Sequence, residues 1–166
     1  SERNLQLDIS THYHAQHFTF EIAAFHNSIQ NYTYESPTDS IIGTSELTYF
    51  IQSDATLYGG EAGFDIHPHP LDWLHFESNF ATVIAQQDNG EYLPFIPADK
   101  ISSEVVAEWK KWKFLSQGYF KIQVVNVLPQ NRVSAEETNS SDYTLLNTGI
   151  GSEIKSKRMR AQLKEA

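Results

Sequence analysis

Residues 5–14 read LQLDISTHYH, and this stretch decides the fold class because its hydrophobic character alternates strictly. The odd positions carry Leu5, Leu7, Ile9, Thr11 and Tyr13, whereas the even positions are polar. A period of two places successive side chains on opposite faces of a β-strand. The stretch is therefore predicted to be a strand with one apolar face and one polar face.

The same alternation recurs along the whole chain. Where its parity changes, near Ala24, we expect a β-bulge. Residues 103–113 would also fit one or two amphipathic helical turns, but strand is the preferred interpretation. Further strands are predicted at residues 18–29, 47–66, 74–84, 101–109, 118–128 and 143–154, with an eighth starting near Arg160.

The connections between these strands alternate in length. Short ones are predicted at residues 15–16, 67–72, 110–117 and 155–158, and long ones at residues 34–46, 86–99 and 129–142. Bacterial outer-membrane barrels have short periplasmic turns and longer extracellular loops. Charge follows the same division. The short connections carry Lys110, Lys111, Lys113, Lys155, Lys157 and Arg158, and the long ones Asp39, Glu46, Asp88, Glu91, Asp99, Glu136, Glu137 and Asp142.

Composition excludes several other classes of protein. The 166 residues carry a net charge of −9, which argues against a general nucleic-acid binder. The absence of cysteine excludes disulfides and thiolate zinc sites. No apolar run is long enough for a membrane-spanning helix, and the first residues lack the pattern of a signal peptide. We therefore expect the chain to begin inside a mature protein, or to be soluble.

Histidines are the first candidate site residues. Five of them cluster in the sequence near predicted short turns: His12, His14, His17, His67 and His69. Imidazole is a common ligand for zinc, copper and nickel. Pro68 and Pro70 disfavour a regular ligand spacing, and the short turns lie away from the expected ligand-binding loops. We therefore assign no metal site.

Other candidate residues also have simpler interpretations. Glu61, His75 and Glu77 could act in acid–base catalysis, but polar residues are expected on the inner face of a large barrel. No nucleophile motif accompanies them, so we assign no catalytic or cofactor-binding residue and expect no enzyme activity. The basic segment at residues 155–160 is interpreted as a solvated turn. Several aromatic residues are typical of membrane-interface belts: Tyr49, Tyr58, Trp73, Trp109, Trp112 and Tyr119.

Several segments resemble, in order and spacing, the later barrel strands of TonB-dependent receptors. The resemblance covers most of the chain, although each segment alone is weak. It is carried by the opening SERNLQLD at residues 1–8, AAFHNSIQNY at 23–32, Gly60 and Glu61 with PLDWL at 70–74, LPFIPA at 93–98, and Gln130 with DYTLLN at 142–147.

The resemblance implies an all-β fold: an antiparallel up-and-down meander of about eight strands, forming part of a transmembrane barrel that needs on the order of 22 to enclose a plug. Residues 1–166 would be the C-terminal portion of that barrel, without the plug domain and the terminal strands. The implied function is uptake across the bacterial outer membrane of a scarce nutrient such as an iron–siderophore complex, haem or cobalamin. Its partners would be the lipid bilayer, the TonB system acting through the plug, and the nutrient at the extracellular loops.

One alternative stays open, a soluble all-β module that binds a ligand or a protein. A soluble β-sandwich also has turn signals at similar spacing. The two hypotheses differ in what covers the apolar face of the strands, which is lipid in a barrel and a packed core in a sandwich. Residues such as Phe76 and Phe80 are therefore predicted to point to the convex face, with no protein over them, if the chain is a barrel wall.

Overall fold

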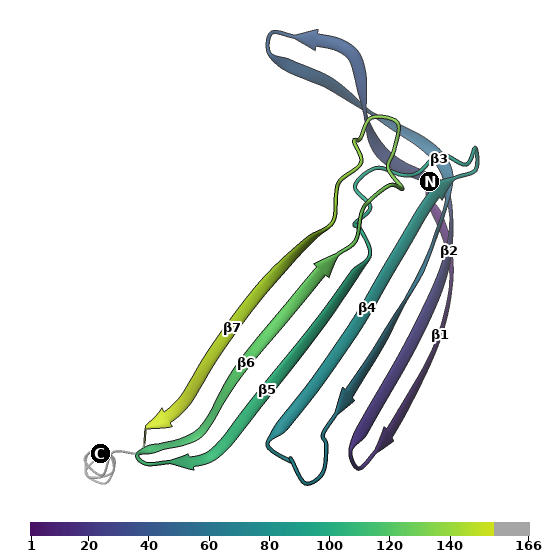
Figure 1. The fold of residues 1–166 in the computed structure, drawn as a ribbon. Helices are drawn as coiled ribbons and strands as arrows, with labels where there is room; N and C mark the ends of the chain where they lie inside the picture. The colour runs from purple at the N-terminus through teal and green to yellow at the C-terminus, as the bar shows by residue number, and fades with distance from the viewer. Residues whose placement is uncertain (155–166) are drawn as a thin grey trace, which may run out of the picture.

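The computed structural model describes residues 1–154, without the side chains of residues 37–41, 45 and 46, and it contains one antiparallel sheet (Figure 1). Each strand pairs with its neighbours in chain order, which confirms the predicted meander. The strands are β1 (Arg3–Ala15), β2 (Phe18–Ile42), β3 (Ser45–Ile66), β4 (Leu74–Gln87), β5 (Lys100–Trp112), β6 (Leu115–Val127) and β7 (Tyr143–Ile154). Within these residues, no helix is long and apolar enough to cross a membrane.

The register of the strands gathers apolar side chains on one face of the sheet. One row of directly paired positions runs from β2 to β6 and reads Phe18, Ile66, Phe76, Val105, Ile122. The adjacent row, on the opposite face, reads Thr19, Asp65, Glu77, Glu104, Gln123 and Asn147. Paired residues point to the same face of a sheet. The apolar sides of the single strands therefore join into one apolar face of the sheet, and their polar sides join into the opposite face.

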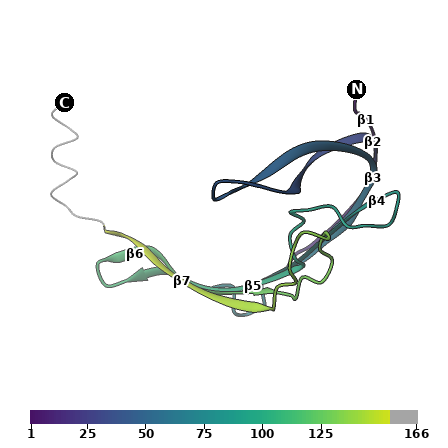
Figure 2. The same cartoon turned by 90° about the horizontal axis from the view of Figure 1, so that it is seen from above.

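The sheet is curved, and its polar face is the concave one. Figure 2 shows the sheet as an arc, with the β4–β5 and β6–β7 loops on its concave side. Leu93 of the β4–β5 loop packs against Ala55 and Ala85, which share the face of Asp65 and Glu77. The apolar face, which includes Phe76 and Phe80, is consequently convex.

The convex face has no protein layer over it within residues 1–154. Leu5, Leu7 and Ile9 are 76%, 71% and 72% exposed, and just four hydrophobic residues of the described chain are buried. Three of these are Ala55 and Ala85 on the concave face and Leu93 of the loop that packs against them. A soluble protein rarely leaves so large an apolar surface uncovered, whereas a bilayer would cover it.

The largest correction to the predicted elements concerns residues 34–46, which were expected to form a long loop. They instead continue the β2–β3 hairpin, so that Gly43 and Thr44 alone connect the two strands. Gly43 has a φ of 69°, which glycine adopts without steric cost. The 25 residues of β2 span roughly 80 Å, well beyond a bilayer. The far end of the hairpin therefore projects past the rest of the sheet (Figure 1).

Smaller corrections concern the bulge and the third short connection. The register is regular through Ala24 and shifts between Ile29 and Tyr32, so the bulge predicted at Ala24 was misplaced. The connection predicted at residues 110–117 is reduced to Lys113 and Phe114, which makes Lys110 and Lys111 strand residues. Residues 103–112 are strand, not helix. The predicted turn at residues 155–158 and the eighth strand lie outside the described residues.

Candidate functional site

The long connections form the first candidate site, because they all lie at one end of the sheet (Figure 1). The β4–β5 loop turns back over the concave face immediately after β4. Its Leu93 N–H donates to the Ala85 carbonyl at 3.0 Å, and the Leu93 side chain is 1% exposed. One buried leucine and two alanines therefore fix where this loop leaves the barrel wall.

The β6–β7 loop is tied to the β4–β5 loop by polar contacts. The Gln130 side chain is buried and donates through Nε2 to the Ile96 carbonyl at 2.8 Å. Arg132 forms an ion pair with Asp99, which also accepts a hydrogen bond from the Thr82 hydroxyl at 2.6 Å. The two loops thus form one unit anchored on the end of β4.

Glu137 makes a further contact between these loops. Its carboxylate accepts hydrogen bonds from the Phe95 N–H at 2.9 Å and from the N–H and hydroxyl of Ser134, each at 3.1 Å. Partial burial acts to raise the pKa of Glu137, but the hydrogen bonds from Phe95 and Ser134 together outweigh it and lower that pKa below its usual value. The carboxylate is therefore charged at neutral pH, and Phe95 is held at the rim with its side chain exposed.

A cavity of about 400 Å³ lies between the two loops and the outer part of the β2–β3 hairpin. Among the residues that the structure describes, its lining holds four glutamates and no lysine or arginine. Tyr34, Tyr92 and Phe95 supply aromatic surface, and the glutamates are Glu35, Glu91, Glu136 and Glu137. Such a lining suits a ligand that has apolar surface and is neutral or positively charged.

The predicted histidine group is divided by the structure. His12 lies 3.9 Å from Glu21, and His14 contacts the Thr19 hydroxyl at 2.9 Å. Neither belongs to the group of potential metal ligands that the described residues form. The rings of His17 and His69 lie 5.4 Å apart. His67 contacts Asp65 and stacks edge-on against His75, with ring centroids 4.3 Å apart.

The acid–base candidates Glu61, His75 and Glu77 all share the concave face but are not brought together. Glu61 pairs with Ala81, six residues beyond His75 on β4. Glu77 accepts a hydrogen bond from Asn79 at 2.6 Å. Sequence reasoning missed Asp65, which joins His67 and His75; the signal was its spacing of two residues from His67, at a strand end.

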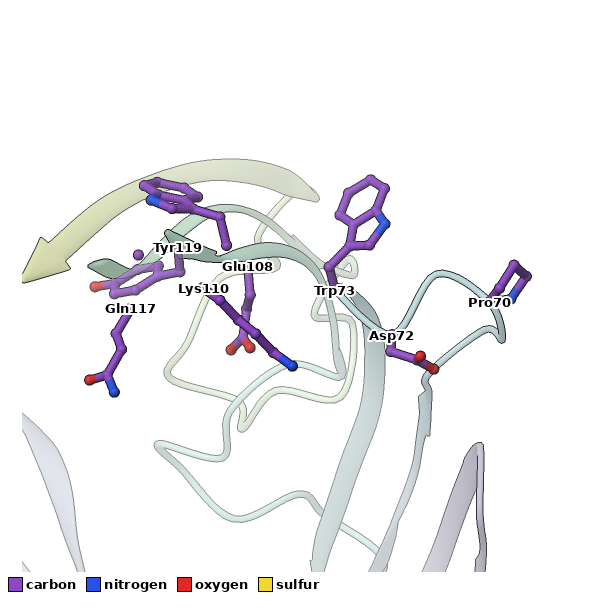
Figure 3. Close-up of a pocket in the computed structure, with 9 residues that line it drawn as sticks. Pro70, Asp72, Trp73, Glu108, Lys110, Gln117 and Tyr119 are labelled. Atoms are coloured by element: carbon purple, nitrogen blue, oxygen red, sulfur yellow. The ribbon is translucent and has the colours of Figure 1, made fainter. Parts of the chain in front are cut away.

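The predicted interface aromatics are split between the two ends of the sheet. Trp73, Trp109, Trp112 and Tyr119 lie at the end with the short connections, and Tyr58 lies toward the loops on the convex face. Tyr49 belongs to the projecting part of the β2–β3 hairpin. Some residues that line a cavity at the short-turn end lie on opposite faces of the sheet. Trp73 points to one side, and Glu108 and Lys110 point to the other (Figure 3).

Comparisons with known proteins agree with this geometry. A family model described as "TonB dependent receptor-like, beta-barrel" matches residues 1–164. The solved structure of a protein named "Copper transporter OprC" superposes with a TM-score of 0.81 over 93% of this chain, at 16% sequence identity. At that identity the likeness shows the fold alone. This chain spans 23% of the length of that transporter. A search of curated proteins found no match.

The sheet topology, the uncovered convex face and the family match over nearly the whole chain lead to one assignment. The family consists of outer-membrane transport receptors and not of enzymes. The chain belongs to the TonB-dependent receptor family and forms part of the outer-membrane β-barrel of such a receptor.

Proposed function

We propose that this chain is the C-terminal portion of the barrel of a receptor that takes up a scarce nutrient across the outer membrane. The single observation that carries the proposal is the continuous apolar convex face opposite a polar concave face, because this is the wall of a lumen set in a bilayer. β1 and β7 each pair with one neighbour within the described residues, so further strands must complete the barrel.

The ligand is proposed to bind at the loop cavity on its way into the lumen. Support comes from the tethered loops, which present a preformed and aromatic surface, and from the exposed Phe95 at its rim. The candidate nutrients are an iron–siderophore complex, haem or cobalamin, and the name of the similar structure adds copper. The glutamates of the lining favour a neutral or cationic complex over a polyanionic one.

The energy for uptake is proposed to come from the TonB system, acting through a plug domain inside the complete barrel. Family membership supports this step. The test is uptake of labelled ferric siderophores, haem, cobalamin and copper by cells with and without the receptor gene, in strains with intact and with deleted TonB. Uptake of one nutrient that requires both genes is the expected result, and no receptor-dependent uptake of any of them would refute the proposal.

A matched pair of variants tests the role of the cavity. Replacing Phe95 with serine removes exposed aromatic surface from the cavity, and should weaken ligand binding about tenfold if that side chain stacks on the ligand. Replacing Phe114 with serine removes a similarly exposed phenylalanine at the opposite end of the sheet and should leave affinity unchanged. Equal affinity of the two variants would place the ligand elsewhere.

A further inference from the structure

A second cluster of polar side chains lies at the short-turn end of the concave face. Asp65 is the penultimate residue of β3, His67 follows that strand, and His75 is the second residue of β4. The three residues offer one ligand atom each, and these atoms all lie within 4.8 Å of one another. The closest contact joins His67 Nε2 to Asp65 Oδ2 at 2.8 Å.

Two atoms of this cluster are buried and have no hydrogen-bond partner among the described residues. They are Asp65 Oδ1 and His75 Nε2. Glu108 Oε2 lies 3.7 Å from His75 Nε2, which is beyond hydrogen-bond distance. A buried polar atom without a hydrogen-bond partner is destabilising, so two such atoms on residues of one cluster indicate a missing partner.

A metal cation would satisfy both atoms at once. Two imidazoles and one carboxylate form the donor set of many zinc sites, and they also suit copper(II) and nickel(II). Zinc binds nitrogen and oxygen ligands at about 2.0–2.2 Å, so the ligand atoms must come to lie roughly 3.5 Å from one another. His67 Nε2 and Asp65 Oδ2, now 2.8 Å apart, would separate slightly to admit the ion. That change requires modest side-chain rotation, which is open to His67 because it lies beyond the last residue of β3.

We propose that Asp65, His67 and His75 bind one divalent transition-metal ion of the zinc class on the concave face of the barrel wall. Glu108 is placed to act as a fourth ligand, since its Oε2 lies 3.7 Å from His75 Nε2. In Figure 3 its carboxylate points to the side of the sheet opposite Trp73. The bound ion would link β3, β4 and β5 at the end of the sheet opposite the loop cavity. The proposal departs from the expectation from sequence of no metal site, and it is independent of which nutrient the receptor transports.

Three further histidines lie at the same end of the sheet but are not part of the proposed site. The His67 N–H donates to the His17 carbonyl at 2.9 Å, which brings the β1–β2 turn against the β3–β4 connection. His69 lies 3.4 Å from Asp72 and faces the ring of His17. His17 and His69 thus form a second pair beside the site, and His12 lies apart from both groups, beside Glu21.

The experiment measures Zn²⁺ binding to the complete receptor, purified in detergent and stripped of metal with a chelator. Isothermal titration with Zn²⁺ compares the wild type with D65N, H67Q and H75Q, and with H12Q as the matched control. Absorption of bound Co²⁺ provides a second readout, because tetrahedral coordination gives intense visible bands that hydrated Co²⁺ lacks.

We expect a binding event in the wild type and in H12Q that is weakened by at least about tenfold in D65N, H67Q and H75Q. Zn²⁺ should also raise the unfolding temperature of the wild type and of H12Q, but not of D65N, a nearly isosteric variant. Equal affinity in all five proteins would overturn the proposal. Loss of binding in H12Q to the same extent as in H75Q would also overturn it, since it would indicate adventitious binding by surface histidines.

Discussion

At the scale of single residues, glycines on the sheet make room for large side chains of the neighbouring strand. A Cβ atom added to Gly118 would lie 2.1 Å from the Trp109 ring, whereas one added to Gly149 would meet the flexible Lys121 side chain at 3.0 Å. Trp109 thus covers a glycine on the convex face, where interfacial tryptophan is favoured.

We expect G118A to displace the Trp109 ring and to destabilise the barrel by about 1–3 kcal/mol, because the added Cβ would overlap this rigid ring. G149A is the control and should cost less, because the Lys121 side chain can move. The measurement is denaturant unfolding of the complete receptor, followed by tryptophan fluorescence. A similar cost for both variants would contradict the close packing of Trp109 on Gly118.

Phe80 and Asn79 are consecutive residues of β4 at the same depth, one on each face of the sheet. F80R should cost about 2–4 kcal/mol if the site is near the bilayer midplane, because arginine would enter lipid. N79R should cost much less, since Asn79 faces the lumen opposite Gly63, which has no side chain. Folding of each receptor variant into liposomes measures the difference, and equal tolerance would argue against lipid contact at Phe80. The same test applies to Phe76.

The candidate sites were less predictable than the faces of the strands. Sequence alternation assigned Asp65 and His75 to a polar face, but it could not show that His67, beyond the end of β3, turns back toward both. The loop cavity depends on contacts such as Glu137 to Phe95, 42 residues apart, which no local pattern reports. Both sites arise from distant segments, and a single sequence carries no direct signal of them.

At the scale of elements, the parity change near Ala24 shows why the bulge was misplaced. Phe25, Asn27 and Ile29 lie on the concave face without any register shift. Ile29 is 6% exposed and pairs with Ala55, against which Leu93 of the β4–β5 loop packs on the concave face. The apolar residues of β2 therefore lie on the concave face where protein covers that face, and this accounts for the parity change. The actual bulge follows Ile29 and left no signal in the alternation.

The bulge itself depends on Asn31, whose φ is 55° and whose N–H donates to Asp54 Oδ1 at 2.8 Å. N31G should be tolerated, since glycine adopts a positive φ freely. N31V should cost about 1–2 kcal/mol, because a β-branched side chain is disfavoured in the left-handed region. Thermal unfolding of the two variants in detergent provides the comparison, and the reverse order of stability would show that this backbone conformation is not required.

The linked loops should respond to pH through Glu137. Its pKa is lowered in the folded protein, so its contribution to stability is complete above the usual value of 4.5 and is lost as pH falls through the lower folded pKa. We expect the hydrogen-exchange protection of the Phe95 amide to fall in this acidic range, and to be low at every pH in E137Q. E136Q is the control, because Glu136 is an exposed neighbour. Protection of Phe95 that is unaffected by E137Q would contradict this role.

At the scale of the whole molecule, the alternation of short and long connections predicted the topology correctly, although one long connection proved to be an extended hairpin. The reason is that residues 34–46 are polar and were interpreted as a loop, whereas backbone pairing between Ile41 and Glu46 continues the ladder. Both interpretations leave the same segment projecting from the same end of the sheet. The up-and-down order and the two faces follow from local patterns, and for that reason they survive errors in individual boundaries.

The orientation of the barrel gives a test of the whole assignment. The loops that frame the cavity should face the outside of the cell, and the β1–β2 turn should face the periplasm, as in barrels with long extracellular loops. The chain contains no cysteine, so a thiol introduced at Glu136 in one receptor variant and at Gln16 in another is unique within this segment. Both residues are exposed. On intact cells, a membrane-impermeant maleimide should label the thiol at Glu136 and spare that at Gln16. After permeabilisation of the outer membrane both should react, and the reverse pattern on intact cells would invert the barrel and place the acidic cavity on the periplasmic side.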